Sequence, residues 1–471
     1  MRKIIKNIWT IFDDNQKFSF SILCLFSVIS TILELLSIGF VVPIIISLGN
    51  ENFFELYPIF NNLNEIIGSP TIREFTVISL IVLLTIYVFK NIFLAYYYWV
   101  EGKFAFDTQE NVSKKLFSAF IKKDYTFHTK NNSADLITRI RTDTLVLREA
   151  VQSLLSLFTN AILILGISTL LFVIEPLGFS ISTFTLIFFS TIFFYFSTKK
   201  SKEIGKMRQA QEILRTQRLQ ESFMGIKEVK TFSKEEFFIE NYKKLTTLLA
   251  KIYSIRHIIL RLPRIFFEII AVLCVIFLTI FLLYSGENNT KIFAILGVFS
   301  LSAIRMLPSL NNILSSINTF KFSQIPVEYI SKNIEINQRD KIRNLKDDFN
   351  FKNSIELKNI YFKYTNRDKF ILEDVSLKIN KGDKIVITGD TGSGKSTLID
   401  IILGIQKPSK GNIYIDNYKK ILNEELWCKK IGYVPQSIYL FDETIKKNIA
   451  IGETQEDIKN EHLNKCIEFQ N

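Results

Sequence analysis

Two stretches of this chain carry no charged residue over more than twenty positions, and a single residue, Glu175, separates them. They are residues 154–174 and 176–198. A helix that crosses the hydrocarbon core of a bilayer needs about 20 mostly apolar residues. Only a helix or a closed barrel satisfies its own backbone hydrogen bonds there. These stretches therefore predict two membrane-spanning helices, over residues 152–174 and 176–198.

Four further apolar runs extend this prediction. The run that ends at Gly286 contains no charge after Glu268, and the other three are each broken once, by Glu34, Lys90 or Arg305. With 48% hydrophobic residues and 43 phenylalanines, the composition is that of a membrane protein. We expect an all-α polytopic membrane domain over residues 1–330, with six transmembrane helices at about 18–50, 75–100, 152–174, 176–198, 263–286 and 291–320.

The charges between these runs predict the orientation of the chain. Residues 49–74 carry four glutamates and one arginine, whereas residues 101–150 carry nine lysines and arginines. Residues 199–261 are also basic. Because basic loops stay in the cytoplasm, both termini are expected there. Basic cytoplasmic loops also account for the net charge of +12, so we predict no nucleic-acid partner. The two cytoplasmic stretches have helical periodicity, with turns near 125–132 and 222–229.

The cysteines and the N-terminus exclude other classes of protein. Four cysteines are scattered without a CxxC pair or a histidine cluster, which argues against zinc or a disulfide framework: Cys24, Cys274, Cys428 and Cys466. The basic N-terminus lacks a small-residue cleavage site, so a removable signal peptide is not expected.

The composition becomes polar after the last apolar run. Residues 331–352 are charged and rich in asparagine, which is typical of a linker. Beyond them, "IELKNIYFKY", "ILEDVSLKI", "KIVITGD", "GNIYIDN" and "KIGYVPQ" are predicted strands. We therefore expect a separate α/β unit over residues 353–471.

This unit contains a phosphate-binding loop. "GDTGSGKS" at 389–396 matches GxxxxGK[ST], between a predicted strand and a predicted helix. Its glycines let backbone N–H groups point at phosphate oxygens, and the following helix adds a positive end. Lys395 would reach the β- and γ-phosphates, and the Ser396 hydroxyl would bind Mg²⁺. The predicted nucleotide-binding residues are Gly389, Asp390, Thr391, Gly392, Ser393, Gly394, Lys395, Ser396 and Thr397.

With its neighbours, this loop resembles that of the ABC (ATP-binding cassette) family. The six predicted spans, the linker, Tyr364 in "IYFKY", "GDTGSGKST" and "YVPQ" together resemble type I exporters that fuse one membrane domain to one nucleotide-binding domain. The resemblance implies that Tyr364 stacks on adenine and that Gln436 contacts Mg²⁺ and the attacking water. It implies catalytic roles for Lys395 and Gln436, ATP and Mg²⁺ as cofactors, and a second half-transporter subunit as partner. The turns near 125–132 and 222–229 would be coupling helices beside Gln436.

Residues 437–471 contain no match to the remaining family motifs: signature, Walker B carboxylates, D-loop or switch histidine. From this we expect a truncated domain that binds ATP without hydrolysing it as a homodimer. A truncated reading frame, a frameshift or a partial record would each account for this ending. A non-hydrolysing half of a heterodimer, or a remnant, is the alternative that this observation leaves open.

The three charges inside apolar spans suggest a substrate, because such charges are expensive and often functional. Glu34, Lys90 and Arg305 could pair with one another, could lie beyond the bilayer, or could face an anionic head group. "ILELLSIGFVVPIIISL" and "GIKEVKTFSKEEFFIENY" are similar to segments of bacterial lipid-linked oligosaccharide flippases. That similarity implies an amphipathic, anionic, lipid-linked substrate in the bacterial inner membrane, with membrane lipids as neighbours. A multidrug, lipid or peptide exporter is the alternative.

Overall fold

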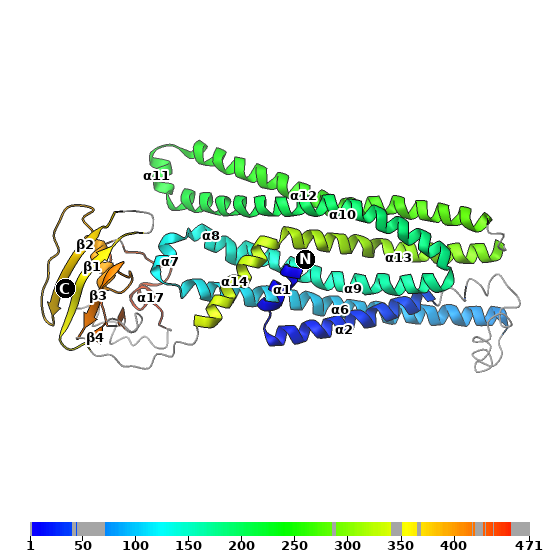
Figure 1. Ribbon diagram of the computed structural model, residues 1–471, viewed down its shortest axis with the longest axis horizontal. Helices are drawn as coiled ribbons and strands as arrows, with labels where there is room; N and C mark the ends of the chain where they lie inside the picture. Colours follow the sequence, from blue (N-terminus) through cyan, green and yellow to red (C-terminus); the bar gives the residue numbers. More distant parts are fainter. Residues whose placement is uncertain are drawn as a thin grey trace. The chain divides into compact units, whose positions relative to one another are not determined.

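The computed structural model describes residues 2–39, 44, 71–284, 289–340, 351–364, 369–416, 418–419, 427–428, 430–436 and 438–453. The chain forms two compact units, residues 1–343 and 344–471. The first unit is helical and the second contains a sheet (Figure 1). Each unit is described by itself.

The first unit consists of long helices that lie side by side, joined by short ones at their ends (Figure 1). Its α-helices and one π-helical turn are α1 (Arg2–Ile11), α2 (Asp14–Gly39), α6 (Ile72–Ile121), α7 (Tyr125–Lys130), α8 (Ser133–Thr138), η1 (Arg139–Asp143), α9 (Thr144–Ile174), α10 (Pro176–Met224), α11 (Ile226–Thr231), α12 (Glu235–Tyr284), α13 (Asn289–Phe322) and α14 (Gln324–Asp340).

Four of the described helical stretches are long and apolar enough to cross a membrane: Asp14–Ser37, Arg73–Ile121, Ser133–Val173 and Glu235–Tyr284. The predicted fourth and sixth spans lie within α10 and α13, which are 49 and 34 residues long. Most of the predicted outer loop at 49–74 lies outside the described residues. α14 continues to Asp340, so the first residues of the predicted linker are helical.

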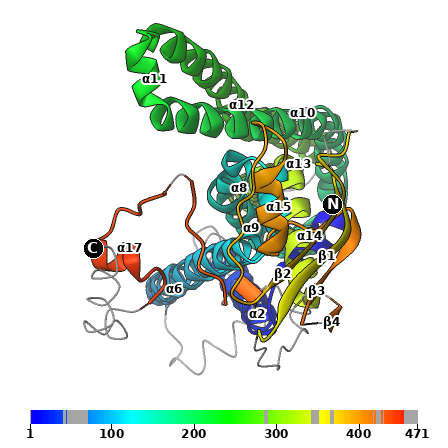
Figure 2. The ribbon, with the colours of Figure 1, turned by 90° about the vertical axis from the view of Figure 1, so that its left-hand side faces the viewer.

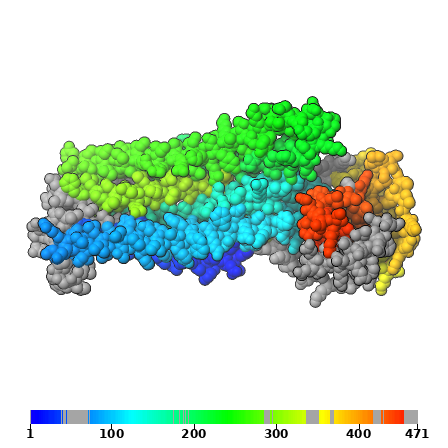
Figure 3. All heavy atoms as spheres, turned by 180° about the vertical axis from the view of Figure 1, so that it is seen from behind, coloured from blue at the N-terminus to red at the C-terminus, as the bar shows by residue number. Residues whose placement is uncertain are grey.

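The long helices expose apolar side chains that a water-soluble protein would bury. On α6, Leu84 is 65% exposed, Phe89 61% and Ile92 65%. Figure 3 shows α6, in blue to cyan, along one face of the molecule. A contiguous apolar surface of this kind is favourable against hydrocarbon rather than water, which agrees with a membrane-spanning role for α6.

Both predicted cytoplasmic turns contain a short helix. α7 follows α6 at the first turn, and α11 follows α10 at the second, where Gly225 ends α10. The long helices α6, α10 and α12 run without a break through their apolar and their charged parts. The helical periodicity predicted for the two basic stretches is therefore confirmed, and these stretches continue the helices of the apolar segments.

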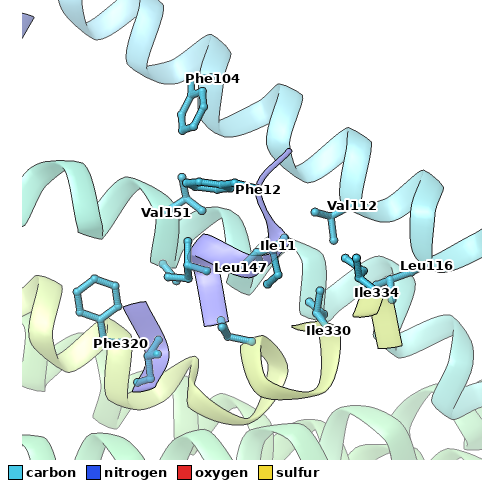
Figure 4. Packing of buried hydrophobic residues seen from close by; sticks show 14 of the residues in the cluster. Ile11, Phe12, Phe104, Val112, Leu116, Leu147, Val151, Phe320, Ile330 and Ile334 are labelled. Carbon is cyan, nitrogen blue, oxygen red and sulfur yellow. The ribbon is translucent and has the colours of Figure 1, made fainter. Parts of the chain in front are cut away.

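The largest hydrophobic cluster joins the N-terminal helix to the end of the first unit. Side chains of α1, α6, α9, α13 and α14 interlock in it (Figure 4). Ile8, Val112, Leu147 and Ile330 are completely buried there. Lys3 of α1 also pairs with Glu328 of α14 at 3.0 Å. α1 and α14 are thus held together although more than 300 positions separate them in the sequence.

The second unit is built on an antiparallel sheet of order β2-β1-β3-β4. Its described elements are β1 (Ser354–Phe362), β2 (Leu372–Asn380), α15 (Lys395–Ile402), β3 (Lys410–Ile415), β4 (Tyr418–Lys419) and α17 (Ile445–Ile449). Figure 2 shows α15 beside this sheet. Leu398 and Ile401 of α15 pack on Leu357, Ile360 and Phe362 of β1.

Two of the five predicted strands are not strands. Residues 383–390 ("DKIVITGD") and 431–435 form no ladder with any described segment. Val386 and Val434 are each 85% exposed. β-Branched composition favours an extended backbone, but a strand also requires a neighbour whose N–H and C=O groups face it. The other three predicted strands are β1, β2 and β3.

Candidate functional site

The first candidate site is the loop that precedes α15. Gly392 and Gly394 have φ angles of +86° and +94°, which favour glycine. A Cβ at Gly394 would also lie 2.8 Å from Ile371 Cγ2. The loop curls back so that the Ser393 N–H donates to the carbonyl of Asp390 at 3.2 Å. These two glycines therefore allow the tight turn that leads directly into the helix.

The Lys395 side chain folds back onto the backbone of this loop. Its Nζ donates to the carbonyl of Gly389 at 2.6 Å and to that of Asp390 at 2.8 Å. Lys395 is also the first residue of α15, so the ammonium group and the positive helix end lie together. The arrangement places positive charge and unsatisfied backbone N–H groups at one point, which suits a phosphate.

Tyr364 is connected to this loop through the buried Thr397. The Tyr364 hydroxyl and Thr397 Oγ1 lie 3.2 Å apart, and either can donate. The ring packs edge-on against Phe362, with centroids 5.0 Å apart. The structure thus brings the predicted adenine contact and the phosphate loop together, and it holds the ring by two contacts.

Gln436, by contrast, is exposed and makes no hydrogen bond to the loop among the described residues. Ser396, Asp390, Thr391 and Ser393 are exposed as well, so their polar groups face solvent. Within the described part of the chain no three His, Cys, Asp or Glu residues cluster as metal ligands do. The Ser396 hydroxyl and the Gln436 amide oxygen therefore fit a Mg²⁺ ion that is also bound by phosphate oxygens of a nucleotide.

The second candidate site lies in the first unit, where the three charges predicted from the spans meet. Lys90 Nζ of α6 lies 2.9 Å from Glu34 Oε2 of α2. Arg305 Nε of α13 lies 3.0 Å from Glu34 Oε1. The second contact has ion-pair distance without hydrogen-bond geometry, so Glu34 Oε1 lacks a hydrogen bond. One carboxylate therefore joins three helices.

The two cations differ in their surroundings. The Lys90 side chain is 2% exposed, lies over the Tyr87 ring at 4.2 Å and is 3.5 Å from Ser37 Oγ. The Arg305 side chain is 41% exposed. Two positive groups face one negative group, so the cluster carries a net positive charge if all three are ionised. The Lys90 side chain is therefore enclosed, whereas the Arg305 side chain is partly accessible.

The sequence did not predict a third cluster, which lies where η1 packs beside α10 on the predicted cytoplasmic side. Asp143 is completely buried and pairs with Arg208 Nη2 at 3.0 Å and Arg139 Nη1 at 3.1 Å. Gln209 Nε2 donates to it at 2.9 Å. Asp135, Arg139 and Asp143 follow one another at four-residue spacing, a signal of paired charges on one helix face. Nothing in that spacing identifies Arg208 as the distant partner.

Comparison with known families identifies both units. The model of the ABC transporter transmembrane region matches residues 20–306. The ABC transporter model, which describes the ATP-binding part, matches residues 372–469.

Individual relatives agree with these matches. A provisionally named ABC transporter ATP-binding protein of Mycoplasma genitalium is 27% identical over 91% of this chain and 73% of its own length. An ATP-dependent permease of Candida albicans is 27% identical over 75% of this chain and 52% of its own. An ATP-dependent lipid A-core flippase of Wigglesworthia glossinidia brevipalpis is 24% identical over 75% of this chain and 60% of its own. The chain thus spans about half to three quarters of the length of these relatives.

A solved structure shares the fold. The structure of a bacterial Atm1-family ABC exporter with ATP bound superimposes with a TM-score of 0.76 at 16% identity. The match covers 97% of this chain and 77% of the other. At this identity the likeness concerns the arrangement of the chain alone.

Proposed function

Because this chain belongs to the ABC transporter family, with an exporter-type transmembrane region and an ATP-binding domain on one polypeptide, we propose that it moves an anionic amphiphile across the bacterial inner membrane. The substrate class we favour is a lipid-linked oligosaccharide or related glycolipid. Transporters of this family work as dimers of half-transporters. A second half-transporter subunit, identical or different, is therefore the proposed partner.

For the nucleotide, the proposal assigns the phosphates of ATP to the loop at 389–397. Lys395 would exchange its two carbonyl contacts for phosphate oxygens, which are stronger acceptors because they are charged. Ser396 and Gln436 would complete the coordination of Mg²⁺, and Tyr364 would contact the base. Bound Mg²⁺ neutralises negative charge that develops on the phosphates. Lys395 and Gln436 are the residues to which we assign catalytic roles.

For the transported substrate, the observation that carries the proposal is the half-exposed Arg305 in a cluster of net positive charge. An uncompensated charge among membrane-spanning helices is costly, and an anion relieves that cost. Lys90 lies at ion-pair distance from Glu34 Oε2, and Glu34 Oε1 has no hydrogen-bond partner among the described residues, so Arg305 keeps N–H donors for a further partner. Arginine matches phosphate with two parallel N–H donors. We therefore infer a phosphate or diphosphate group as the substrate's charged part.

Polar groups along the same helix support a sugar-bearing substrate. Ser302 Oγ and Asn311 Oδ1 of α13 are buried without a hydrogen-bond partner among the described residues. Asn312 Nδ2 lies 3.4 Å from Asn160 Oδ1 of α9. Unsatisfied polar groups among spanning helices are expensive unless something bonds to them. Hydroxyl-rich sugars carry both donors and acceptors. The flippase name of the Wigglesworthia relative is consistent with this class of substrate.

This substrate assignment is tested by binding to the purified chain in lipid nanodiscs, without nucleotide. Arg305→Ala is expected to weaken binding of a polyprenyl-diphosphate-linked saccharide by about tenfold, or about 1.4 kcal/mol. Arg305→Lys keeps the charge and should recover part of the loss. Arg264→Ala is the matched control, since Arg264 is exposed on α12 and pairs only locally with Glu268.

Two results would contradict the assignment. One is an unchanged affinity in Arg305→Ala, and the other is an equal loss in Arg264→Ala. If a neutral drug-like amphiphile competes as well as the diphosphate lipid does, the multidrug alternative gains the support instead.

A further inference from the structure

A half-open cavity of about 60 Å³ lies between α9, α10, α12 and α13. Its walls belong to the predicted membrane spans, and no ionisable group of the Glu34 cluster reaches it. Six of the lining residues show how the four helices contribute: Leu171, Phe179, Ala271, Cys274, Phe299 and Ala303.

Small side chains on two of these helices line the cavity. Ala271 of α12 and Ala303 of α13 offer single methyl groups, whereas Phe299, Met306 and Leu307 beside them on α13 are large. Spanning helices normally pack small residues closely against a neighbour. Here the small residues line open space, so the volume is available to a guest.

The chemistry of the walls excludes a polar guest. Among the lining residues only Thr183 and the thiol of Cys274 carry polar atoms. A buried water needs two to four polar partners, and apolar cavities stay dry and take apolar guests instead. The volume has room for roughly four to six groups of water or methylene size. That is a short segment of a hydrocarbon chain.

The positions of the lining residues along their helices place the cavity within the bilayer. Leu171 precedes the end of α9 by three residues, and Phe179 follows the start of α10 by three. At 1.5 Å per residue, both lie about 6 Å along the helix from Glu175. The charge distribution of the loops predicts that this turn faces outward. On α12 and α13, however, Ala271 and Ala303 lie about 20 Å from the helix ends Tyr284 and Asn289, so the cavity extends from this turn toward the middle of the bilayer.

The cavity is separate from the proposed head-group site. Ala303 and Arg305 stand two positions apart on α13, so their side chains leave the helix about 200° apart. Arg305 faces Glu34 on α2, whereas Ala303 faces the cavity. A guest in one site does not fill the other.

We propose that this cavity binds one hydrocarbon chain from the surrounding bilayer. The chain is either an acyl chain of a membrane lipid or the polyprenyl chain of an amphiphile. Binding of a polyprenyl chain rests on the proposed function. Binding of an acyl chain does not, because the surrounding lipids supply it.

Photo-crosslinking tests this site without nucleotide or transport. The purified chain is placed in nanodiscs of phosphatidylethanolamine and phosphatidylglycerol that contain a phospholipid with a mid-chain diazirine. Crosslinks are mapped by mass spectrometry. The expected result is a concentration of crosslinks at the cavity residues of α12 and α13. Added polyprenyl phosphate reduces these crosslinks if the polyprenyl chain is the preferred guest, and leaves them unchanged if the acyl chain is.

Filling the cavity provides the control. Ala303→Phe, or the smaller Ala303→Val if the first variant does not fold, is expected to reduce the crosslinks at α12 several-fold. Ala95→Phe adds the same bulk at an exposed position of α6 and should leave them unchanged. Crosslinks spread evenly over all exposed helices, or equal in the filled and control variants, overturn the proposal. Arg305→Ala is expected to leave these crosslinks unchanged. The cavity proposal and the head-group assignment can therefore be refuted independently of each other.

Discussion

At the scale of single residues, the functional groups of this chain are defined by what each side chain contacts. Lys395 bonds two carbonyls of its own loop, whereas Lys90 is enclosed by a carboxylate, an aromatic ring and a hydroxyl. The two lysines carry the same charge. Their surroundings make the first available to a phosphate and the second part of the packing between α2 and α6.

Lys395→Ala is expected to weaken ATP binding by tenfold or more, because the loop loses the one ammonium that its backbone holds in place. Lys384→Ala, at an exposed lysine in the preceding segment, should leave the affinity within about twofold. A fluorescent ATP analogue titrated into the purified chain measures both. Equal affinities for the two variants would refute the assigned role of Lys395.

Asp416 predicts a pH dependence in the second unit. Burial alone would raise the pKa of its carboxyl, but the N–H groups of Lys352, Asn353 and Ser354 donate to it and hold the pKa below its ordinary value. A carboxyl with a lowered folded-state pKa stabilises the fold above its unfolded-state pKa, and this contribution disappears as the pH falls.

Asp416→Asn keeps the size of the side chain and removes the charge. Amide hydrogen exchange at residues 352–354 should be faster in this variant than in the parent chain above about pH 5. The difference should shrink only below about pH 4, as the pH falls through the lowered pKa of the parent carboxyl. A difference that stays constant with pH would show that the charge is not the cause.

At the scale of elements, small residues decide where the long helices cross. A Cβ on Gly205 of α10 would lie 2.4 Å from the carbonyl oxygen of Phe322, the last residue of α13. Nearby, Ser201 Oγ donates to Asn318 Oδ1 at 3.1 Å. The close approach places Phe322 beneath the guanidinium groups of Arg208 and Arg256. Glycine at position 205 lowers the helix propensity of α10 but allows the close contact with α13.

Gly205→Ala is expected to destabilise the first unit by about 1–3 kcal/mol, because backbone atoms cannot yield as a flexible side chain can. Gly102→Ala on α6 is the control, since a Cβ there meets nothing within 4 Å. It should be neutral or stabilising by up to about 1 kcal/mol through helix propensity. Thermal unfolding in detergent measures both, and equal melting temperatures for the two variants would contradict the crossing.

At the scale of the whole molecule, the charge asymmetry of the loops predicts which ends of the helices face the cytoplasm. The α7 and α11 turns belong to the basic side, and the Glu175 turn belongs to the opposite side. ATP is found in the cytoplasm, so an ATP-binding domain requires the cytoplasmic C-terminus that the loop charges predict.

In a chain whose four cysteines are replaced by serine, Lys130→Cys and Glu175→Cys report this orientation. A membrane-impermeant maleimide added to intact cells should label Glu175→Cys and not Lys130→Cys. Both should react once the membrane is permeabilised. The reverse pattern would invert the proposed topology.

The features that the amino-acid sequence predicted correctly are local ones. Apolar runs of about 20 residues specify membrane helices, and the spacing of Gly389, Gly394 and Lys395 specifies a loop followed by a helix start. The information for each lies within a few turns of chain, because backbone hydrogen bonds and glycine φ angles are satisfied there.

The tertiary structure decided everything that depends on distant partners. Glu34 is the shared partner of Lys90 and Arg305 in the structure. The sequence alone left three alternatives for these charges: an ion pair, a position in water beyond the bilayer, or contact with a substrate. The tertiary structure also brought Arg208 to Asp143, and it left residues 383–390 without a strand to pair with. Ion pairs, ladders and cavities each need two segments in one place. Which segments meet is determined by packing over the whole fold, and no local pattern in the sequence contains that information.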